Sequence, residues 1–229
     1  MKNTKVEALR GLVEFGIPVS QIIDVGVQRA TFELIKCFPD LEHILFEPAD
    51  NFNADIRANY KNIEHKLFNV AISSKAGKLF QTVTSIKKNG IATHSRVTQD
   101  ERLVDGNFII SSKPIDVLTL DSYVDFIKPE CLLKVDVDGA DLEVIKGADL
   151  VLKKSSIVVI EATKEDFIER ANYVISRGFE LANIVDRTLY GPSMWQFDYI
   201  FVRSELLREK DFPVPSKNFD LNLWRNVDR

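Results

Sequence analysis

Three charged side chains alternate with valines in the segment KVDVDG, residues 134–139. If residues 131–139 form a strand, Lys134, Asp136 and Asp138 lie on one face of it and the valines lie on the other. Three charges on one face of a central strand are costly to bury unless they pair with each other or face a cleft. We therefore expect the carboxyl end of this strand to form the floor of an active site, with these side chains as candidates for catalysis.

Glu161 ends the apolar run SIVVIEA, residues 156–162, which we expect to be the neighbouring strand. It is the natural partner for Lys134 and a fourth candidate catalytic residue. Two other interpretations remain open. The charges form a purely structural network in which Asp138 caps the helix that begins near residue 140, or the carboxylates bind a divalent metal, because hard cations take oxygen ligands. We predict no metal, since the same carboxylates can pair with Lys134 or act as a base.

A second group of residues stands at the expected ends of the first two strands. The apolar run IIDVG places Asp24 and Gly26 at the first strand end, and Glu47 follows 23 positions after Asp24, with Pro48 behind it. An acidic side chain at this position and spacing accepts the two hydroxyls of a ribose in nucleotide-binding sheets. Alone, Asp24 also fits a turn or a helix cap, and Glu47 a solvated strand end. Together they favour an adenosine-containing ligand.

The turn after the first strand lacks the glycines of a dinucleotide-binding loop. Such a loop needs glycine at its second position, where the backbone approaches the pyrophosphate, and at its third, where the helix packs closely. This chain has Gln28 and Thr31 there. The sequence therefore disfavours a dinucleotide as the ligand.

A long polar segment, residues 85–107, has no periodicity that identifies a strand or a helix. A connection of this length in a compact domain is more often a functional loop or lid than an idle one. We expect residues 88–96 to close over the substrate. His94 lies within this stretch and is a candidate general base, because a loop histidine titrates near neutral pH.

Apolar runs and helical periodicity alternate along most of the chain, which predicts an α/β fold with a parallel sheet and helices on both faces. The last two strands follow each other without a helix, which predicts a hairpin and an antiparallel strand. The expected strands are 22–26, 43–47, 65–72, 78–84, 108–119, 131–139, 156–162, 179–187 and 196–203. The expected helices are 6–15, 30–37, 49–60, 120–128, 140–153 and 164–177. The expected divisions are an N-terminal helical extension (1–19), a central domain (20–204) and a C-terminal tail (205–229).

Composition narrows the function classes. A net charge of −4 argues against nucleic acid as the main partner, because phosphate neutralisation needs an excess of Lys and Arg on one face. The N-terminal residues do not read as a signal peptide, and no apolar run is long enough to span a membrane. Cys37 and Cys131 each stand beside apolar neighbours and are expected to be reduced thiols. We therefore expect a cytoplasmic protein.

Taken together and in this order, the motifs resemble those of the FkbM family of S-adenosylmethionine-dependent methyltransferases. The resemblance covers roughly residues 20–203. Its most specific part is the long fourth-strand motif, in which Lys-x-Asp-x-acid-Gly is followed by Glu-x-x-x-x-Gly-Ala. The matching segments are DVG (24–26), FEP (46–48), NVAIS (69–73), TLD (119–121), KVDVDGADLEVIKGA (134–148) and VIEA (159–162).

The resemblance implies a class I methyltransferase fold: a Rossmann-like three-layer α/β/α sandwich around a mostly parallel seven-stranded sheet, with one antiparallel strand from a C-terminal hairpin. It implies S-adenosylmethionine as cofactor, and methyl transfer to an oxygen of a sugar or another small natural-product or glycan acceptor. By position, the turn after the first strand touches the methionine part, Glu47 holds the ribose, and residues 69–71 lie near the adenine. The expected cofactor-binding residues are Asp24, Gly26, Val27, Gln28, Glu47, Pro48, Asn69, Val70, Ala71 and Asp136.

Two departures from the family pattern stand out. The family usually has Asp-Val-Gly-Ala-Asn-x-Gly in the first motif, where this chain has Val27, Gln28 and Ala30, and the fourth-strand acid, commonly Glu, is Asp138 here. If Ala30 must take a positive φ, it costs about 1 kcal/mol; in the first turn of a helix it is harmless. The altered motif leaves an alternative function open, that of a non-catalytic or vestigial binding module. The sequence does not indicate an oligomeric state.

Overall fold

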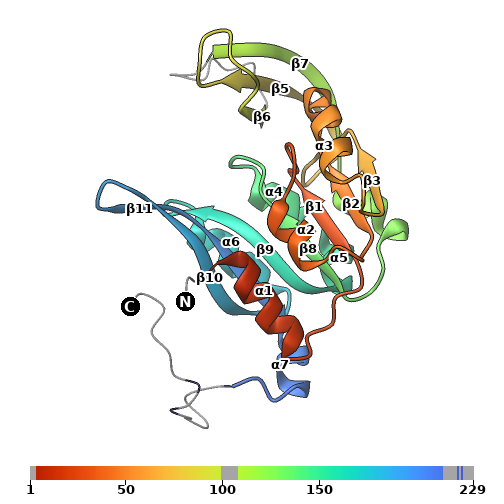
Figure 1. The fold of residues 1–229 in the computed structure, drawn as a ribbon, viewed down its shortest axis with the longest axis vertical. Coiled ribbons are helices and arrows are strands. Elements are labelled where there is room, and N and C mark those ends of the chain that lie inside the picture. Colours follow the sequence, from red (N-terminus) through yellow and green to blue (C-terminus); the bar gives the residue numbers. More distant parts are fainter. Residues whose placement is uncertain (1–3, 99–107, 214–220, 222, 224–229) are drawn as a thin grey trace.

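A seven-stranded sheet lies between two layers of helices, and a four-stranded sheet, here called the roof, stands over one end of it (Figure 1). The structure is a computed structural model that describes residues 4–98, 108–213, 221 and 223. In sheet order, the main sheet consists of β10 (Phe179–Tyr190), β11 (Ser193–Arg203), β9 (Ser155–Thr163), β8 (Cys131–Val135), β1 (Ile22–Val25), β2 (His43–Phe46) and β3 (His65–Phe68).

The topology of the main sheet confirms the predicted fold class. Neighbouring strands are parallel except for the two pairs that involve β11, which runs antiparallel to both β9 and β10. The final hairpin thus supplies the single antiparallel strand, as expected for a class I methyltransferase fold. The strands of a parallel sheet end on a common edge, and a ligand crevice forms outside their carboxyl ends.

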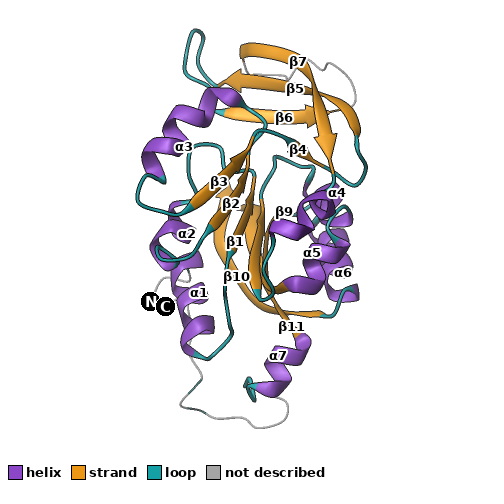
Figure 2. Cartoon of the chain, turned by 90° about the vertical axis from the view of Figure 1, so that its right-hand side faces the viewer, coloured by secondary structure: helices purple, strands orange, loops and turns teal. Residues whose placement is uncertain are grey.

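Helices cover both faces of the main sheet (Figure 2). One layer holds α1, α2 and α3, and the other holds α4, α5 and α6. A short helix, α7, follows β11, and two 3₁₀ helices, η1 and η2, complete the described elements. Their bounds are α1 (Lys5–Glu14), α2 (Phe32–Cys37), η1 (Asp50–Phe52), α3 (Asn53–Asn59), η2 (Leu120–Phe126), α4 (Asp141–Lys146), α5 (Asp149–Lys154), α6 (Phe167–Ser176) and α7 (Ser204–Glu209).

Alternate side chains of the central strands pack against opposite helical layers, as the period of two of a strand requires. Ile22 packs in one cluster with Leu9 and Leu12 of α1. Ile23 packs in the other cluster with Val144 of α4 and with α6. All four residues of β1 are buried, which explains its continuous apolar run and singles out Asp24 as a charged side chain inside the protein.

The roof is a four-stranded sheet that the sequence does not predict as such. It consists of β4 (Ala71–Ile72), β7 (Phe108–Leu118), β5 (Gly77–Ser85) and β6 (His94–Thr98), in that order. The expectation of an irregular polar stretch over 85–107 is therefore wrong at β6, whereas residues 99–107 lie outside the described part. The buried positions of β5 include Thr82 and Thr84, so these strands lack the apolar run that identifies the main-sheet strands.

Several other elements differ from their predicted extents, and three of them show a local feature at the point of difference. The strand expected over 65–72 divides at residues 69–70 into β3 and β4, which belong to different sheets. The strand expected over 131–139 ends at Val135, because the chain turns through positive φ at Asp138 and Gly139. The helix expected over 140–153 breaks at Gly147, where an added Cβ would lie 2.1 Å from the carbonyl oxygen of Ser73.

Gly26, directly after β1, is required by close packing as well as by backbone conformation. Its φ is +86°, and a Cβ there would lie 1.8 Å from the carbonyl oxygen of Asp136. Gly178 has the same φ, but its Cβ would meet nothing within 4 Å. Replacing each of these two glycines by alanine therefore separates the free-energy cost of the positive φ from the cost of the steric clash with Asp136.

We expect Gly26→Ala to lower the free energy of unfolding by about 2–4 kcal/mol, the sum of a left-handed backbone and an overpacked contact. Gly178→Ala, the matched control, should lower it by about 1 kcal/mol. Urea denaturation of both variants measures the difference. Equal losses would show that the approach of Asp136 to Gly26 is not tight.

Candidate active site

A cavity of about 300 Å³ lies at the carboxyl ends of β1, β2 and β8, below the roof. This is the edge at which a doubly wound sheet binds its ligand, and the size is at the lower end of ligand pockets. Most of the residues predicted for the site line it. The predicted residues that line it are Gly26, Val27, Gln28, Glu47, Pro48, Val70, Ala71, Lys134, Asp136 and Asp138. Lining residues that were not predicted for the site include Lys5, Ala30, Thr31, Glu33, Ser95 and Val97.

The ammonium of Lys134 joins the ends of the two central strands. Lys134 and Asp24 are partners in the register of β8 and β1, and their side chains are 3% and 0% exposed. Lys134 Nζ lies 3.1 Å from Asp24 Oδ1 and 3.5 Å from Asp136 Oδ2, and it donates to the carbonyl oxygen of Gly26 at 2.9 Å. Burial alone would lower the pKa of Lys134, but the two carboxylates reverse this and hold it above its usual range.

The predicted pairing of Lys134 with Glu161 is wrong. Asp24, on the other neighbouring strand, takes that place. Glu161 Oε1 instead accepts a hydrogen bond from Gln196 Nε2 of β11 at 2.8 Å. Burial, followed by the charges of Asp136 and nearby acidic groups, raises the pKa of Glu161 to about 8. Its carboxyl group therefore gains and loses its proton close to neutral pH.

The turn after β1 holds a buried carboxylate. Gln28 takes a φ of +53°, which turns its backbone N–H toward Glu47. Glu47 is 3% exposed, and its carboxylate accepts from Gln28 N at 2.9 Å and from Ala49 N at 2.8 Å. Burial raises the pKa of Glu47 to about 7, and the two backbone donors oppose this rise.

Gln28 and Arg29 tie this turn to the roof. Gln28 Nε2 donates to the carbonyl oxygen of Thr93, and Arg29 Nη2 donates to that of Ala92, both at 2.7 Å. The positive φ falls on Gln28 and not on Ala30. The strain considered for Ala30 is therefore absent, and alanine lines the cavity there without a backbone penalty.

The residues expected near the adenine divide into two groups. Val70 and Ala71 line the cavity. Asn69 is exposed, and its side chain donates to the carbonyl oxygen of Glu47 at 2.9 Å and bonds to Asn53. Asn69 thus holds the end of β2 instead of lining the cavity.

The loop after β8 depends on an ion pair that sequence reasoning missed. Asp141 accepts from the backbone N–H groups of Val137 at 3.0 Å and Gly139 at 3.2 Å, and it pairs with the buried Arg170 of α6 at 3.1 Å. The N-cap of α4 is Ala140, which makes no side-chain capping hydrogen bond, so the cap expected from Asp138 is wrong, and Asp141 holds the loop that precedes the helix. The sequence contained one indication of this ion pair. Arg170 falls on the apolar stripe of its helix, with Phe167 and Val174, and a charge at such a position needs a buried partner.

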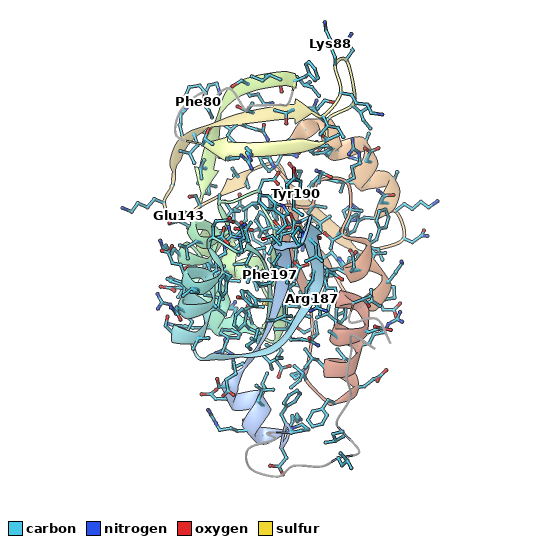
Figure 3. All side chains as sticks on the ribbon, turned by 90° about the vertical axis from the view of Figure 1, so that its left-hand side faces the viewer. Phe80, Lys88, Glu143, Arg187, Tyr190 and Phe197 are labelled. Carbon is cyan, nitrogen blue, oxygen red and sulfur yellow. The ribbon has the colours of Figure 1, made fainter. Side chains whose placement is uncertain are left out.

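The segment expected to close over the substrate has two parts. Ser95 and Val97 of β6 line the cavity, while Lys88 stands at the outer tip of the roof and points away from it (Figure 3). The backbone of His94 pairs with Thr84, but its side chain lies outside the described part, so its role as a base stays a prediction. In the described part of the chain, no three His, Cys, Asp or Glu side chains are grouped to hold a metal ion.

The sequence profile of the methyltransferase FkbM domain matches residues 24–181. This chain belongs to the FkbM methyltransferase family. The predicted family is thereby confirmed, and the match spans β1 to the first residues of β10. No curated protein sequence matches the chain.

Solved structures of similar fold include several methyltransferases. They include a ribosomal protein L11 methylase from Lactobacillus delbrueckii subsp. bulgaricus, with 8% identity over 86% of this chain and 76% of that one, and a TM-score of 0.48. A precorrin-6y C5,15-methyltransferase from Geobacter metallireducens has 13% identity, coverage of 89% and 93%, and a TM-score of 0.45. Magnesium protoporphyrin IX methyltransferase from Synechocystis, with bound S-adenosylmethionine, has 7% identity, coverage of 87% and 76%, and a TM-score of 0.47.

S-adenosylmethionine is the cofactor of this FkbM methyltransferase, and the residues of the cavity fit it. Gly26 brings the turn after β1 to the wall of the cavity, and Glu47, which also lines it, presents a buried carboxylate at the end of β2. Among the described helices, none has the length and apolar character needed to cross a membrane.

Cofactor affinity should depend on the protonation of Glu47. Hydroxyl groups of a ribose donate to the ionised carboxylate, so protonation below pH 7 should weaken binding by up to about tenfold per pH unit. The sign for stability is opposite: the raised pKa stabilises the free protein below pH 4.5, and this stabilisation is lost as pH rises through about 7.

Calorimetry with S-adenosylhomocysteine between pH 6 and 8.5 measures this dependence. In Glu47→Gln, affinity should be low and independent of pH over this range. A wild-type affinity that stays constant from pH 6 to 8.5 would contradict the role of Glu47.

Proposed function

We propose that this chain transfers the methyl group of S-adenosylmethionine to a hydroxyl oxygen of a sugar or another small natural-product or glycan acceptor. The observation that carries this proposal is the cluster of carboxylates on the floor of the cofactor cavity. Asp136 and Asp138 line the same cavity as Gly26 and Glu47. A methyl donor bound there brings its reactive carbon close to groups that accept protons.

The cofactor supplies an activated methyl group, and the protein has to align the acceptor and accept its proton. A neutral hydroxyl needs a base with a pKa near the working pH. Glu161, with its pKa raised to about 8 by burial and by nearby carboxylates, meets that requirement but is not among the residues that line the cavity, whereas Asp138 lines it. Asp136 lies 3.5 Å from Lys134, and we assign it a positioning role.

The roof offers a hydrogen bond to an acceptor. The fully buried Gln81 donates from Nε2 to Ser95 Oγ at 3.1 Å. With its oxygen so occupied, the Ser95 hydroxyl is free to donate its proton into the cavity that it lines. The acceptor would thus be held between Ser95 above and the aspartates below.

Aromatic side chains at the tip of the β10–β11 hairpin also support a sugar-sized acceptor. The pairing of Gln196 with Thr163 leaves the tip beyond the end of β9, on the side of the sheet where the cavity lies. Tyr190 is 82% exposed and Trp195 is 45% exposed, and Figure 3 shows Tyr190 below the roof. Exposed rings of this kind combine an apolar face with a polar group, a combination that suits sugar rings.

The remaining expectations belong to the same proposal. Acidic side chains in the cavity and a net charge of −4 favour a small-molecule or glycan acceptor over nucleic acid. Cys37 and Cys131 are free thiols, which agrees with a cytoplasmic location. The catalytic domain would comprise residues 20–204, between the N-terminal extension and the C-terminal tail.

A transfer assay tests the function directly. The protein is incubated with S-adenosylmethionine that carries a labelled methyl group and with a panel of sugars and hydroxylated small molecules. The labelled product should be stable to base, as a methyl ether is. Transfer only to amines or RNA would overturn the proposed acceptor class. Cofactor binding without transfer to any member of a broad panel would favour the non-catalytic alternative.

Asp138→Asn should lower kcat by about 100-fold, the usual contribution of a positioned proton acceptor. Asparagine tolerates the left-handed φ of +53° at this position, so the affinity for S-adenosylhomocysteine should be retained. The control is Asp116→Asn, an exposed carboxylate of the roof paired with Lys78, which should change neither quantity. An unchanged kcat in Asp138→Asn would exclude Asp138 from catalysis.

A further inference from the structure

The cofactor cavity contains more negative than positive charge. Of the described residues that line it, only Lys5 and Lys134 are basic, against four carboxylates. The acidic side chains are Glu33, Glu47, Asp136 and Asp138. This balance suits the sulfonium and the ammonium of S-adenosylmethionine, but the carboxylate of its methionine part would face repulsion without a positive partner.

Lys134 is not available as that partner. Its Nζ donates to the carbonyl oxygen of Gly26 at 2.9 Å and lies 3.1 Å from Asp24 Oδ1 and 3.5 Å from Asp136 Oδ2, and an ammonium has three N–H donors. Its side chain is 3% exposed. A ligand carboxylate would have to displace one of these contacts.

Lys5, the first residue of α1, is held in place from two sides. Its Nζ lies 3.0 Å from Asp198 Oδ2 and 3.8 Å from Asp186 Oδ2, and its backbone N–H donates to Asp186 Oδ1 at 3.3 Å. Thr4 and Glu7 form a capping box that fixes the start of the helix. Only Asp198 lies within hydrogen-bond distance of Nζ, and Asp186 lies farther away, so these two aspartates leave at least one of its three N–H donors for a ligand in the cavity that Lys5 lines.

We propose that Lys5 binds the α-carboxylate of the methionine part of the cofactor, an inference that rests on the cofactor occupying this cavity as in the proposed function. Lys5 lies outside the stretch that matches the family, residues 24–181. Asp186 and Asp198, which position it, lie outside that stretch as well. The N-terminal helix and the final hairpin therefore complete the cofactor site in this chain.

The experiment compares two ligands that differ by one carboxylate. S-adenosylhomocysteine carries it, and 5′-deoxy-5′-(3-aminopropylthio)adenosine, the decarboxylated analogue, keeps the amine and the adenosine. Calorimetry should show that the wild type prefers S-adenosylhomocysteine. Lys5→Met should weaken S-adenosylhomocysteine by about tenfold or more, as expected for one charge-assisted hydrogen bond, and leave the analogue unchanged.

Three variants control for folding and for charge. Lys5→Arg keeps a cation and should keep the preference. Asp198→Asn removes the carboxylate that pairs with Lys5 but leaves Lys5 in place, so it should also retain the preference for S-adenosylhomocysteine. In Lys5→Met alone, Asp198 is left buried without its cation, and the variant can unfold for that reason. The double variant Lys5→Met, Asp198→Asn removes that carboxylate charge as well. It should lose the preference for S-adenosylhomocysteine as Lys5→Met does, so the test stays valid if Lys5→Met alone unfolds. Thermal unfolding of each variant verifies the fold.

The outcomes separate this inference from the proposed function. If Lys5→Met weakens both ligands equally, or if the wild type binds both with equal affinity, Lys5 does not bind the carboxylate, while the cofactor site stands. If the wild type binds neither ligand at millimolar concentration, the cofactor does not occupy this cavity, and the proposed function fails together with the inference.

Discussion

The ammonium of Lys134 is the interaction on which the rest of the site depends. It lies between Asp24 at the end of β1 and Asp136 beyond the end of β8, and it also binds the carbonyl oxygen of Gly26. Without it, the carboxylate of Asp24, which is 0% exposed, would be buried with no cation beside it. With it, the turn after β1 is held against β8, and Gly26 lies close enough to Asp136 that no side chain fits there.

The unusual residues of the first motif follow from the same arrangement. A left-handed residue is needed two positions after Gly26 so that its N–H can reach Glu47, and Gln28 takes that conformation. Its strain, about 1 kcal/mol, is offset by side-chain and backbone hydrogen bonds. Asp138 is also left-handed, a conformation in which Asp is enriched over most other residues. Aspartate in place of the family's usual glutamate therefore suits the backbone at that point.

The sequence predicted the main sheet well, because buried parallel strands such as β1 and β9 are continuous apolar runs. It predicted the roof poorly, because β5 and β6 are rich in Thr and Ser and are stabilised by pairing between distant segments. In the site, strand-end positions identified Gly26, Glu47 and Asp136 as cavity residues. The partner of Lys134 was assigned to the wrong neighbour, since spacing along the chain does not reveal which adjacent strand presents its carboxylate. Lys5 was missed because only the folded chain brings α1 to the cavity.

The hydrogen bonds between the turn after β1 and the roof join side chains of the turn to backbone carbonyl groups of the roof hairpin. Gln28 and Arg29 bind the oxygens of Thr93 and Ala92, and every amino acid offers that oxygen. These two hydrogen bonds therefore depend on the path of the roof hairpin and not on which side chains stand at its positions 92 and 93. Correlated substitutions between the two segments would not be expected among relatives, although the contact is direct.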